Sequence, residues 1–355
     1  MSKDIKGIVL GVDALDPRWM KYWFAQGEMP YTRSLVQDGT VDLQNVNSVT
    51  APSHSEPYTH IAWTSIYTGL QPAQHGVTSG PVMMRKHNFA EDVGATLFDD
   101  VSDKYKMASF RLPMTWPARP INGWMISGFP AGGRDGKGLT EREVYGLSPD
   151  DAPDDFHRME STRMSHSDDA EYAKTLNNCF KKDRRGLEIF DGLLEGDEDV
   201  LMFGTKIADT VGHYFFENIQ RGLDEDTELL DLPREERDFA TSGAARIGYA
   251  AVDYLIEGLI EEYDPEYLWA IGDHGFDRYQ ENGHHAMPTA YLEYARDEKP
   301  AIGDATCITD LRDQMIRRLG LTRQTECFDG EETDTEVTQE EIDQVTQQLE
   351  DLGYM

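Results

Sequence analysis

The sequence of 355 residues has few cysteines and no long apolar segment. Its three cysteines, Cys179, Cys307 and Cys327, are far apart, which excludes a disulfide framework and a zinc ribbon. No apolar run reaches the roughly 20 residues that span a bilayer. The first residues lead directly into a strand-like segment, without the basic start and apolar middle of a secretory signal. The sequence therefore predicts a cytoplasmic protein that is not inserted in a membrane.

Positive charge is also scarce. The chain has 33 Lys and Arg, of which 12 are Lys, against 66 Asp and Glu, and its formal net charge is −33. Such a charge opposes binding to a nucleic-acid polymer or an anionic membrane surface. The acidic, lysine-poor composition is similar to that of cytoplasmic proteins from extreme halophiles, with an ordinary acidic enzyme as the alternative. The composition leaves the oligomeric state open.

Short apolar runs alternate with segments of helical periodicity along the chain. The runs lie at 5–12, 106–112, 124–128, 200–204 and 268–272, and the helix-like segments at 17–38, 62–70, 171–195 and 241–263. Continuous apolar runs are typical of strands buried on both faces. Their alternation with helices predicts an α/β fold with a mainly parallel central sheet, whose ligands bind beyond the carboxyl ends of the strands.

The composition also predicts the domain organisation. Residues 1–321 form the main α/β domain, which carries the candidate site. Within it, residues 130–170 are rich in Gly, Asp, Pro and Ser and are expected to form a loop-rich insertion. Residues 322–355 are expected to form an acidic linker and a C-terminal amphipathic helix over 338–352.

Four groups of polar residues lie near the ends of strand-like runs. They are Asp13; Thr59, followed downstream by His75; Asp209 with His213; and Asp273 and His274, followed by His284 and His285. Carboxylate and imidazole suit zinc or manganese, and three Asp with several His are what a two-metal hydrolytic site requires. A hydroxyl near such ions loses its proton more readily and becomes a nucleophile.

The local spacing supports this chemistry. Asp209 and His213 are four residues apart, so one turn of helix places both on the same face. Asp273 and His274 diverge unless the backbone turns after them, and we expect Gly275 to permit that turn. Thr59 is expected just before a helix, whose free N–H groups can receive a phosphate oxygen.

Each group also has a structural interpretation. Asp13 alone fits a helix N-cap better than a ligand, and an Asp and a His four residues apart occur often by chance. His75, before Gly76, is expected to be structural. The remaining histidines have no partner pattern and are expected at the surface or in loops: His54, His60, His87, His157 and His166. The case for a site rests on the conjunction of the groups and their order.

That conjunction resembles the type I phosphodiesterase/nucleotide pyrophosphatase family of the alkaline phosphatase superfamily. The strand ending in Asp13 matches the family's first motif. Residues 57–65 (PYTHIAWTS), followed by Thr68-Gly69, Pro72 and His75-Gly76, match its nucleophile motif, except that Ile61 replaces the usual Pro. Further matches are 112–117 (LPMTWP), 122–129 (NGWMISGF), Asp209 to His213, Asp273 to Phe276, and 352–354 (LGY). The resemblance covers about residues 5–320 and the last few.

The resemblance implies an alkaline-phosphatase-like three-layer α/β/α sandwich and a metal-dependent phosphoric ester hydrolase. One divalent ion, zinc or alternatively manganese, would be held by Asp13, Asp273, His274 and the nucleophile Thr59. A second would be held by Asp209, His213 and a late histidine. His285 is the first choice for that histidine, and His284 is the alternative.

Other functions remain open from the sequence. A phosphomonoesterase would use the same metals with a basic residue for the extra phosphate charge, for which Arg111 and Arg85 are candidates. A sulfatase is disfavoured because no Cys has the required context, and phosphoglycerate mutase because this chain lacks room for its second domain. A binding protein without activity is disfavoured because all the expected ligands are present. We expect a small phosphate ester as the substrate.

The net charge generates the first testable prediction. Self-repulsion of a chain with charge −33 is screened in molar salt, where the Debye length is about 3 Å. We expect the protein to unfold when salt is removed by dialysis, and circular dichroism at decreasing salt would measure this. A protein that is fully stable in dilute buffer would contradict the halophilic interpretation.

Overall fold

The fold was analysed in a computed structural model. The structure describes residues 4–52, 54, 56–78, 93–129, 139–151, 169–210, 212, 243–279, 282–300, 305–326, 338–340 and 343, with the backbone alone for 169–180, 243–247, 277–279 and 282–284. Most of the expected insertion at 130–170 and of the expected tail helix at 338–352 lies outside these residues.

The described residues form an eight-stranded sheet in the order β2-β10-β7-β1-β6-β3-β4-β5. Its strands are β1 (Gly7–Val12), β2 (Val41–Asn47), β3 (Met107–Phe110), β4 (Gly123–Ile126), β5 (Val144–Tyr145), β6 (Val200–Thr205), β7 (Tyr267–Gly272) and β10 (Pro288–Ala295). The five central strands β7, β1, β6, β3 and β4 pair in parallel. The outer pairs β10–β7, β10–β2 and β4–β5 are antiparallel.

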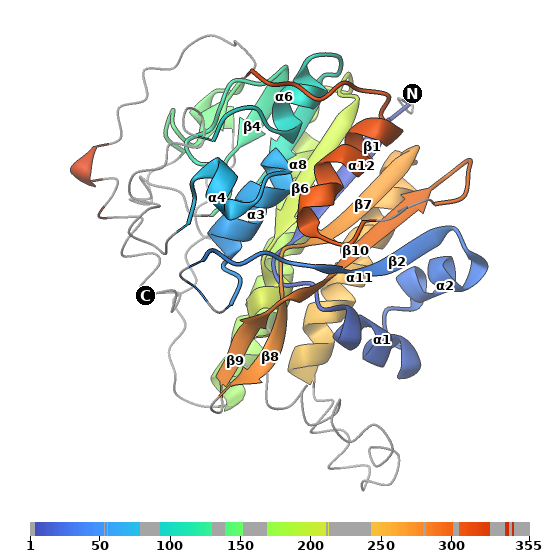
Figure 1. Cartoon of the computed structure of the whole chain (residues 1–355). Helices are drawn as coiled ribbons and strands as arrows, with labels where there is room; N and C mark the ends of the chain where they lie inside the picture. The colour runs from blue at the N-terminus through green and yellow to red at the C-terminus, as the bar shows by residue number, and fades with distance from the viewer. Residues whose placement is uncertain are drawn as a thin grey trace, which may run out of the picture.

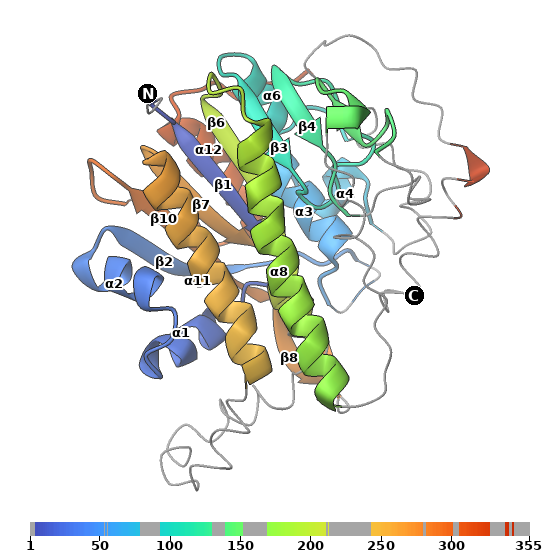
Figure 2. The ribbon, with the colours of Figure 1, turned by 180° about the vertical axis from the view of Figure 1, so that it is seen from behind.

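Helices cover both faces of this sheet (Figures 1 and 2). They are α1 (Pro17–Ala25), α2 (Pro30–Asp38), α3 (Thr59–Thr68), α4 (Pro72–His75), α6 (Leu97–Ser102), α8 (Asp169–Leu193), α11 (Gly243–Tyr263) and α12 (Leu311–Arg318), with 3-10 turns at Pro149–Asp151 and Ile308–Asp310. A separate hairpin of β8 (Gly275–Tyr279) and β9 (Asn282–Ala286) extends beyond the sheet. The predicted three-layer α/β/α sandwich with a mainly parallel sheet is confirmed.

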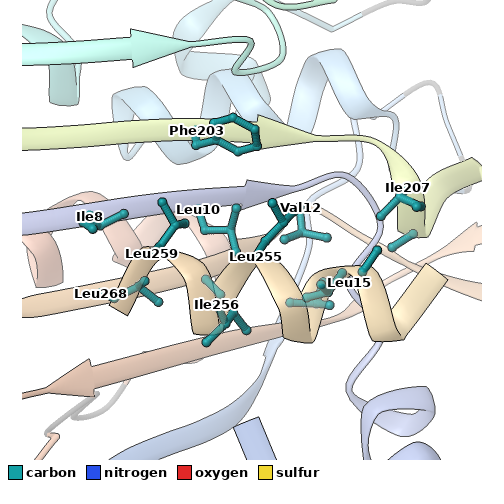
Figure 3. Packing of buried hydrophobic residues seen from close by; sticks show 14 of the residues in the cluster. Ile8, Leu10, Val12, Leu15, Phe203, Ile207, Leu255, Ile256, Leu259 and Leu268 are labelled. Carbon is teal, nitrogen blue, oxygen red and sulfur yellow. The ribbon is translucent and has the colours of Figure 1, made fainter. Parts of the chain in front are cut away.

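Strand β1 lies at the centre and contributes to the core on both faces. Ile8, Leu10 and Val12 pack with Leu255 and Leu259 of α11 on one side (Figure 3). On the other side Val9 packs against the layer that contains α3, α6 and α12. Every residue of α3 is buried, so this helix is fixed between the sheet and its neighbours. Among the described helices, none has the length and apolarity needed to cross a membrane.

The predicted helix over 17–38 is wrong in its continuity. The helix is interrupted between α1 and α2, where Gly27 and Met29 adopt left-handed conformations with φ of 80° and 50° and Pro30 starts the next helix.

Strands β2 and β10 had no counterpart among the predicted strands. The polar, partly exposed β2 lies at the sheet edge and pairs with the strand β10. Strand β10 contains Glu293, which is fully buried and accepts hydrogen bonds from Arg318 and Trp269.

Candidate metal centre and active site

The parallel pairing of β7, β1 and β6 brings three predicted residues to one edge of the sheet. Asp13 directly follows β1, Asp273 directly follows β7, and Asp209 lies four residues beyond β6. Val12 of β1 is in register with Gly272 of β7 and Thr205 of β6, so the three strands end together. All three carboxylates are buried, with exposed fractions of 0% for Asp13 and Asp273 and 4% for Asp209.

Thr59 reaches this edge from the helical layer. It is the first residue of α3, after Tyr58 in extended conformation, and it is 4% exposed. Its Oγ1 lies 3.4 Å from Oδ1 of Asp13 and 3.3 Å from Nε2 of His274. Thr59 was expected just before a helix, and it lies one position further on, as the first residue of the helix. A hydroxyl at this place lies at the positive end of the helix, beside free N–H groups.

Two histidines complete the cluster, and both are oriented by backbone carbonyls. His274 Nδ1 lies 3.1 Å from Gly275 O, and its Nε2 lies 3.5 Å from Asp13 and 3.6 Å from Asp273. His285 Nδ1 lies 2.9 Å from Pro57 O, and its Nε2 lies 3.9 Å from Asp209. Because the carbonyls accept from Nδ1–H, each Nε2 carries the lone pair of the neutral ring, as in histidines that ligate metals.

The structure brings together Asp13, Thr59, Asp209, Asp273, His274 and His285, and their roles as ligands stay predictions. Within this cluster, two groups have ligand atoms within 4.8 Å of one another: Asp13, Asp273 and His274, and Asp209, His274 and His285. The rings of His274 and His285 stack with centroids 3.7 Å apart. His213 and the side chain of His284 lie outside the described residues, so the choice between His285 and His284 stays as predicted.

The carboxylates have unused acceptor capacity that a cation would satisfy. Asp273 Oδ1 accepts from Ala14 N at 2.9 Å, whereas Asp273 Oδ2 and Asp13 Oδ2 accept no hydrogen bond among the described residues. A buried carboxylate without hydrogen bonds is costly unless it is paired or binds a metal. Buried Asp, His and Thr oxygen and nitrogen donors fit a zinc or manganese ion.

Gly275 is required for a different reason from the predicted one. Its backbone does not adopt a positive φ, so the chain makes no left-handed turn after His274. A Cβ at this position would lie 2.3 Å from Pro288 O and 2.6 Å from Asp16 Oδ2. Glycine therefore permits β8 to pass close to β10 and to Asp16, which accepts from Phe276 N at 3.1 Å. This packing fixes the start of the hairpin that carries His285.

The remaining predicted residues lie away from this cluster or have structural contacts. Arg111 follows β3, which is separated from β1 by β6, and its guanidinium lies 3.5 Å from Asp183 of α8. Its role in substrate binding stays a prediction, and Arg85 lies outside the described residues. His75 is structural as expected, since it bonds to Ser65 and Val77. The surface location predicted for His60 is wrong, because His60 is 6% exposed within α3.

Sequence reasoning missed one cation of the site. Lys206 directly follows β6, and its Nζ lies 3.6 Å from Asp13 Oδ2. The available signal was its place at the carboxyl end of a central strand, three residues before Asp209. A lone lysine has no motif, so only the structure associates it with Asp13.

Without bound metal, His274 and Asp273 hold their protons to higher pH in the folded protein than in the unfolded chain. Burial disfavours the imidazolium of His274, but the carboxylates of Asp273 and Asp13 outweigh burial and raise the pKa of His274 to about 9. For Asp273 the effect of burial has the opposite sign, and it raises the pKa of this carboxyl well above its ordinary value. The folded metal-free protein therefore binds more protons than the unfolded chain between pH 6.5, the ordinary pKa of His, and about 9.

A pH dependence of stability follows. The free energy of unfolding of the metal-free protein should fall as the pH rises from 6.5 to 9, because the protonated His274 stabilises the fold only below its pKa. Metal ions require deprotonated ligands, so loading should abolish this slope. Thermal unfolding in high salt with a chelator, compared with the zinc-loaded protein, measures both. His274→Gln should reduce the slope and leave only the part that Asp273 contributes through its own raised pKa, and an unchanged slope in that variant would contradict the assignment.

A protein-family model described as "Type I phosphodiesterase / nucleotide pyrophosphatase" matches residues 7–352. A search of curated proteins finds no significant match in sequence.

Three solved structures that resemble the chain are 14–17% identical to it in sequence. Phosphonoacetate hydrolase from Sinorhizobium meliloti 1021, in complex with phosphonoacetate, is 17% identical with a TM-score of 0.44, and the alignment covers 78% of this chain and 57% of that one. The C-terminal periplasmic domain of EcEptC from Escherichia coli, in complex with Zn, is 14% identical, with 90% and 84% covered and a TM-score of 0.43. Phosphonate monoester hydrolase SpPMH from Silicibacter pomeroyi is 14% identical, with 90% and 74% covered and a TM-score of 0.47.

The match to the family model spans nearly the whole chain and includes every residue of the cluster. The description of this model names phosphodiesterases and nucleotide pyrophosphatases, which hydrolyse phosphoric esters. The chain belongs to the type I phosphodiesterase/nucleotide pyrophosphatase family.

Proposed function

We propose that the protein is a phosphodiesterase that uses two divalent metal ions and Thr59 as its nucleophile. One observation carries the proposal. The Thr59 hydroxyl lies at a helix N-terminus within 3.4 Å of Asp13 Oδ1 and His274 Nε2, and Asp13 and His274 cluster in turn with Asp273 and Asp209. A small phosphate ester is the expected substrate, because the net charge of −33 opposes an anionic polymer.

The residues fit two ions. Asp13, Asp273, His274 and Thr59 would hold the first, and Asp209 and His285 would hold the second together with His213. Bound zinc or manganese ions would promote ionisation of the Thr59 hydroxyl and offset the charge of the phosphate. Two divalent ions outweigh the three carboxylates by one positive charge, so the loaded site would attract an anion within an acidic protein.

Thr59 would attack phosphorus in line with the leaving oxygen. The bond from Oγ1 to phosphorus forms, the bond from phosphorus to the leaving oxygen breaks, and the departing alcohol or phosphate takes up a proton from solvent. The oxygen of a water molecule then bonds to phosphorus, the bond from phosphorus to Oγ1 breaks, and the phosphate monoester and a proton leave as the Thr59 hydroxyl is regenerated. The buried α3 holds Thr59 in place, and its N–H groups at the first turn would bind a non-bridging oxygen.

The alternative hydroxyls of α3 are engaged elsewhere. Thr64 Oγ1 donates to His60 O at 2.7 Å within the helix. Ser65 Oγ lies 2.9 Å from His75 Nε2, which resembles an activated pair. However, His75 Nδ1 accepts from Val77 N at 3.1 Å, so the neutral ring carries its proton on Nε2 and donates it to Ser65. His75 therefore does not act as a base toward Ser65.

A phosphomonoesterase is the second candidate. A dianionic monoester requires more positive charge than a diester, and Lys206 at 3.6 Å from Asp13 supplies one cation beside the site. The family supports the diesterase, and Lys206 is the observation that favours activity on monoesters as well. Assays on bis-p-nitrophenyl phosphate and p-nitrophenyl phosphate, side by side in high salt, distinguish the two.

Substitution of Thr59 tests the nucleophile. Thr59→Ala should lower kcat on bis-p-nitrophenyl phosphate by a factor of about 1,000 or more while metal content stays near two ions per chain, because covalent catalysis is lost. Thr64→Ala is the matched control in the same helix, and it should retain most of the activity. If Thr59→Ala keeps substantial activity, Thr64 or Ser65 becomes the candidate nucleophile.

A further inference from the structure

Lys206 places an ammonium group beside the proposed metal centre. Its Nζ lies 3.6 Å from Oδ2 of Asp13, while Oδ1 of the same carboxylate lies 3.4 Å from Thr59 Oγ1. The Lys206 side chain is 24% exposed, whereas Asp13 is fully buried. The lysine therefore extends from the accessible rim of the site toward the carboxylate that adjoins the nucleophile.

The surrounding residues hold the backbone of this lysine beside Asp13. Its ammonium lies 3.8 Å from the centre of the Phe129 ring, a cation–π contact. Its neighbour Thr205 donates through Oγ1 to Asp183, accepts from Ile207 N at 3.2 Å, and through its carbonyl accepts from Asp13 N at 3.0 Å. The backbone on which Lys206 is mounted is thus tied directly to that of Asp13.

The approach of Phe129 depends on the preceding glycine. A Cβ on Gly128 would lie 2.0 Å from Leu112 O and 2.4 Å from Arg111 O. Only a residue without a side chain allows the segment after β4 to pass this close to the segment after β3. This close approach leaves the ring of Phe129 beside Lys206.

We propose that Lys206 binds a non-bridging oxygen of the substrate phosphate, an inference that rests on the proposed function. A metal ion on Asp13 would take over the neutralisation of that carboxylate, and the flexible four-carbon side chain of Lys206 then turns its ammonium toward the phosphoryl group on Thr59. An ammonium at this place stabilises a dianion more than a monoanion. Lys206 thereby favours phosphate and phosphomonoesters relative to diesters.

Lys206→Met tests the inference through binding rather than turnover. The zinc-loaded variant should bind inorganic phosphate at least about tenfold more weakly than the wild type in calorimetry, with an unchanged zinc stoichiometry. Lys206→Arg keeps the charge and should retain most of the affinity. Lys181→Met removes an exposed lysine of α8 and is the matched control, which should bind phosphate as the wild type does. If Lys206→Met does not fold, Lys206→Gln replaces it in the same titration.

The result that would overturn the role of Lys206 differs from the result that would overturn the proposed function. If Lys206→Met binds phosphate normally and zinc more tightly, the lysine is only a counter-ion of Asp13, and the inference is overturned while the proposed function stands. If the wild-type protein takes up no divalent metal, the proposed function fails, and the inference fails with it. A change in the ratio of KM for p-nitrophenyl phosphate to KM for bis-p-nitrophenyl phosphate in Lys206→Met, with the monoester affected more, would support the inference independently.

Discussion

The parallel pairing of β7, β1 and β6 is the constraint on which the site depends. Because these strands end in register, the chain delivers Asp13, Asp273 and the segment leading to Asp209 to one edge of the sheet. Their backbones are further linked there, since Asp13 N donates to Thr205 O and Ala14 N donates to the carboxylate of Asp273. A shift in the register of β1 would separate the carboxylates from one another and from Thr59.

This arrangement is costly without a cation. Three buried carboxylates repel one another, and in the metal-free protein their charge is partly offset by Lys206 and by an elevated pKa of His274. The buried Asp100 differs, because Arg312 satisfies both of its oxygens in a bidentate contact. The contrast between satisfied acids in the core and unsatisfied oxygens at Asp13 and Asp273 distinguishes the site from structural ion pairs.

The sequence predicted the features that come from local pattern. Apolar runs located five central strands, and the order of Asp13, Thr59, Asp209 and Asp273 identified the cluster. Pairing partners were not local information, so the polar β2 and the Glu-containing β10 were missed. Lys206 was missed because its importance comes from a contact with Asp13 across nearly two hundred residues of sequence. The reason for Gly275, a close approach rather than a turn, likewise depends on distant Pro288.

The most direct test of the account is anomalous X-ray scattering from crystals of the wild-type protein grown with zinc. The account predicts two ions per chain, one bound by Asp13, Asp273, His274 and Thr59, and one bound by Asp209, His213 and His285. It also predicts that the rings of His274 and His285 separate from their stacked position at 3.7 Å, because each Nε2 then binds a different ion. Crystals without an ion at this edge of the sheet, with Lys206 still paired to Asp13, would contradict it.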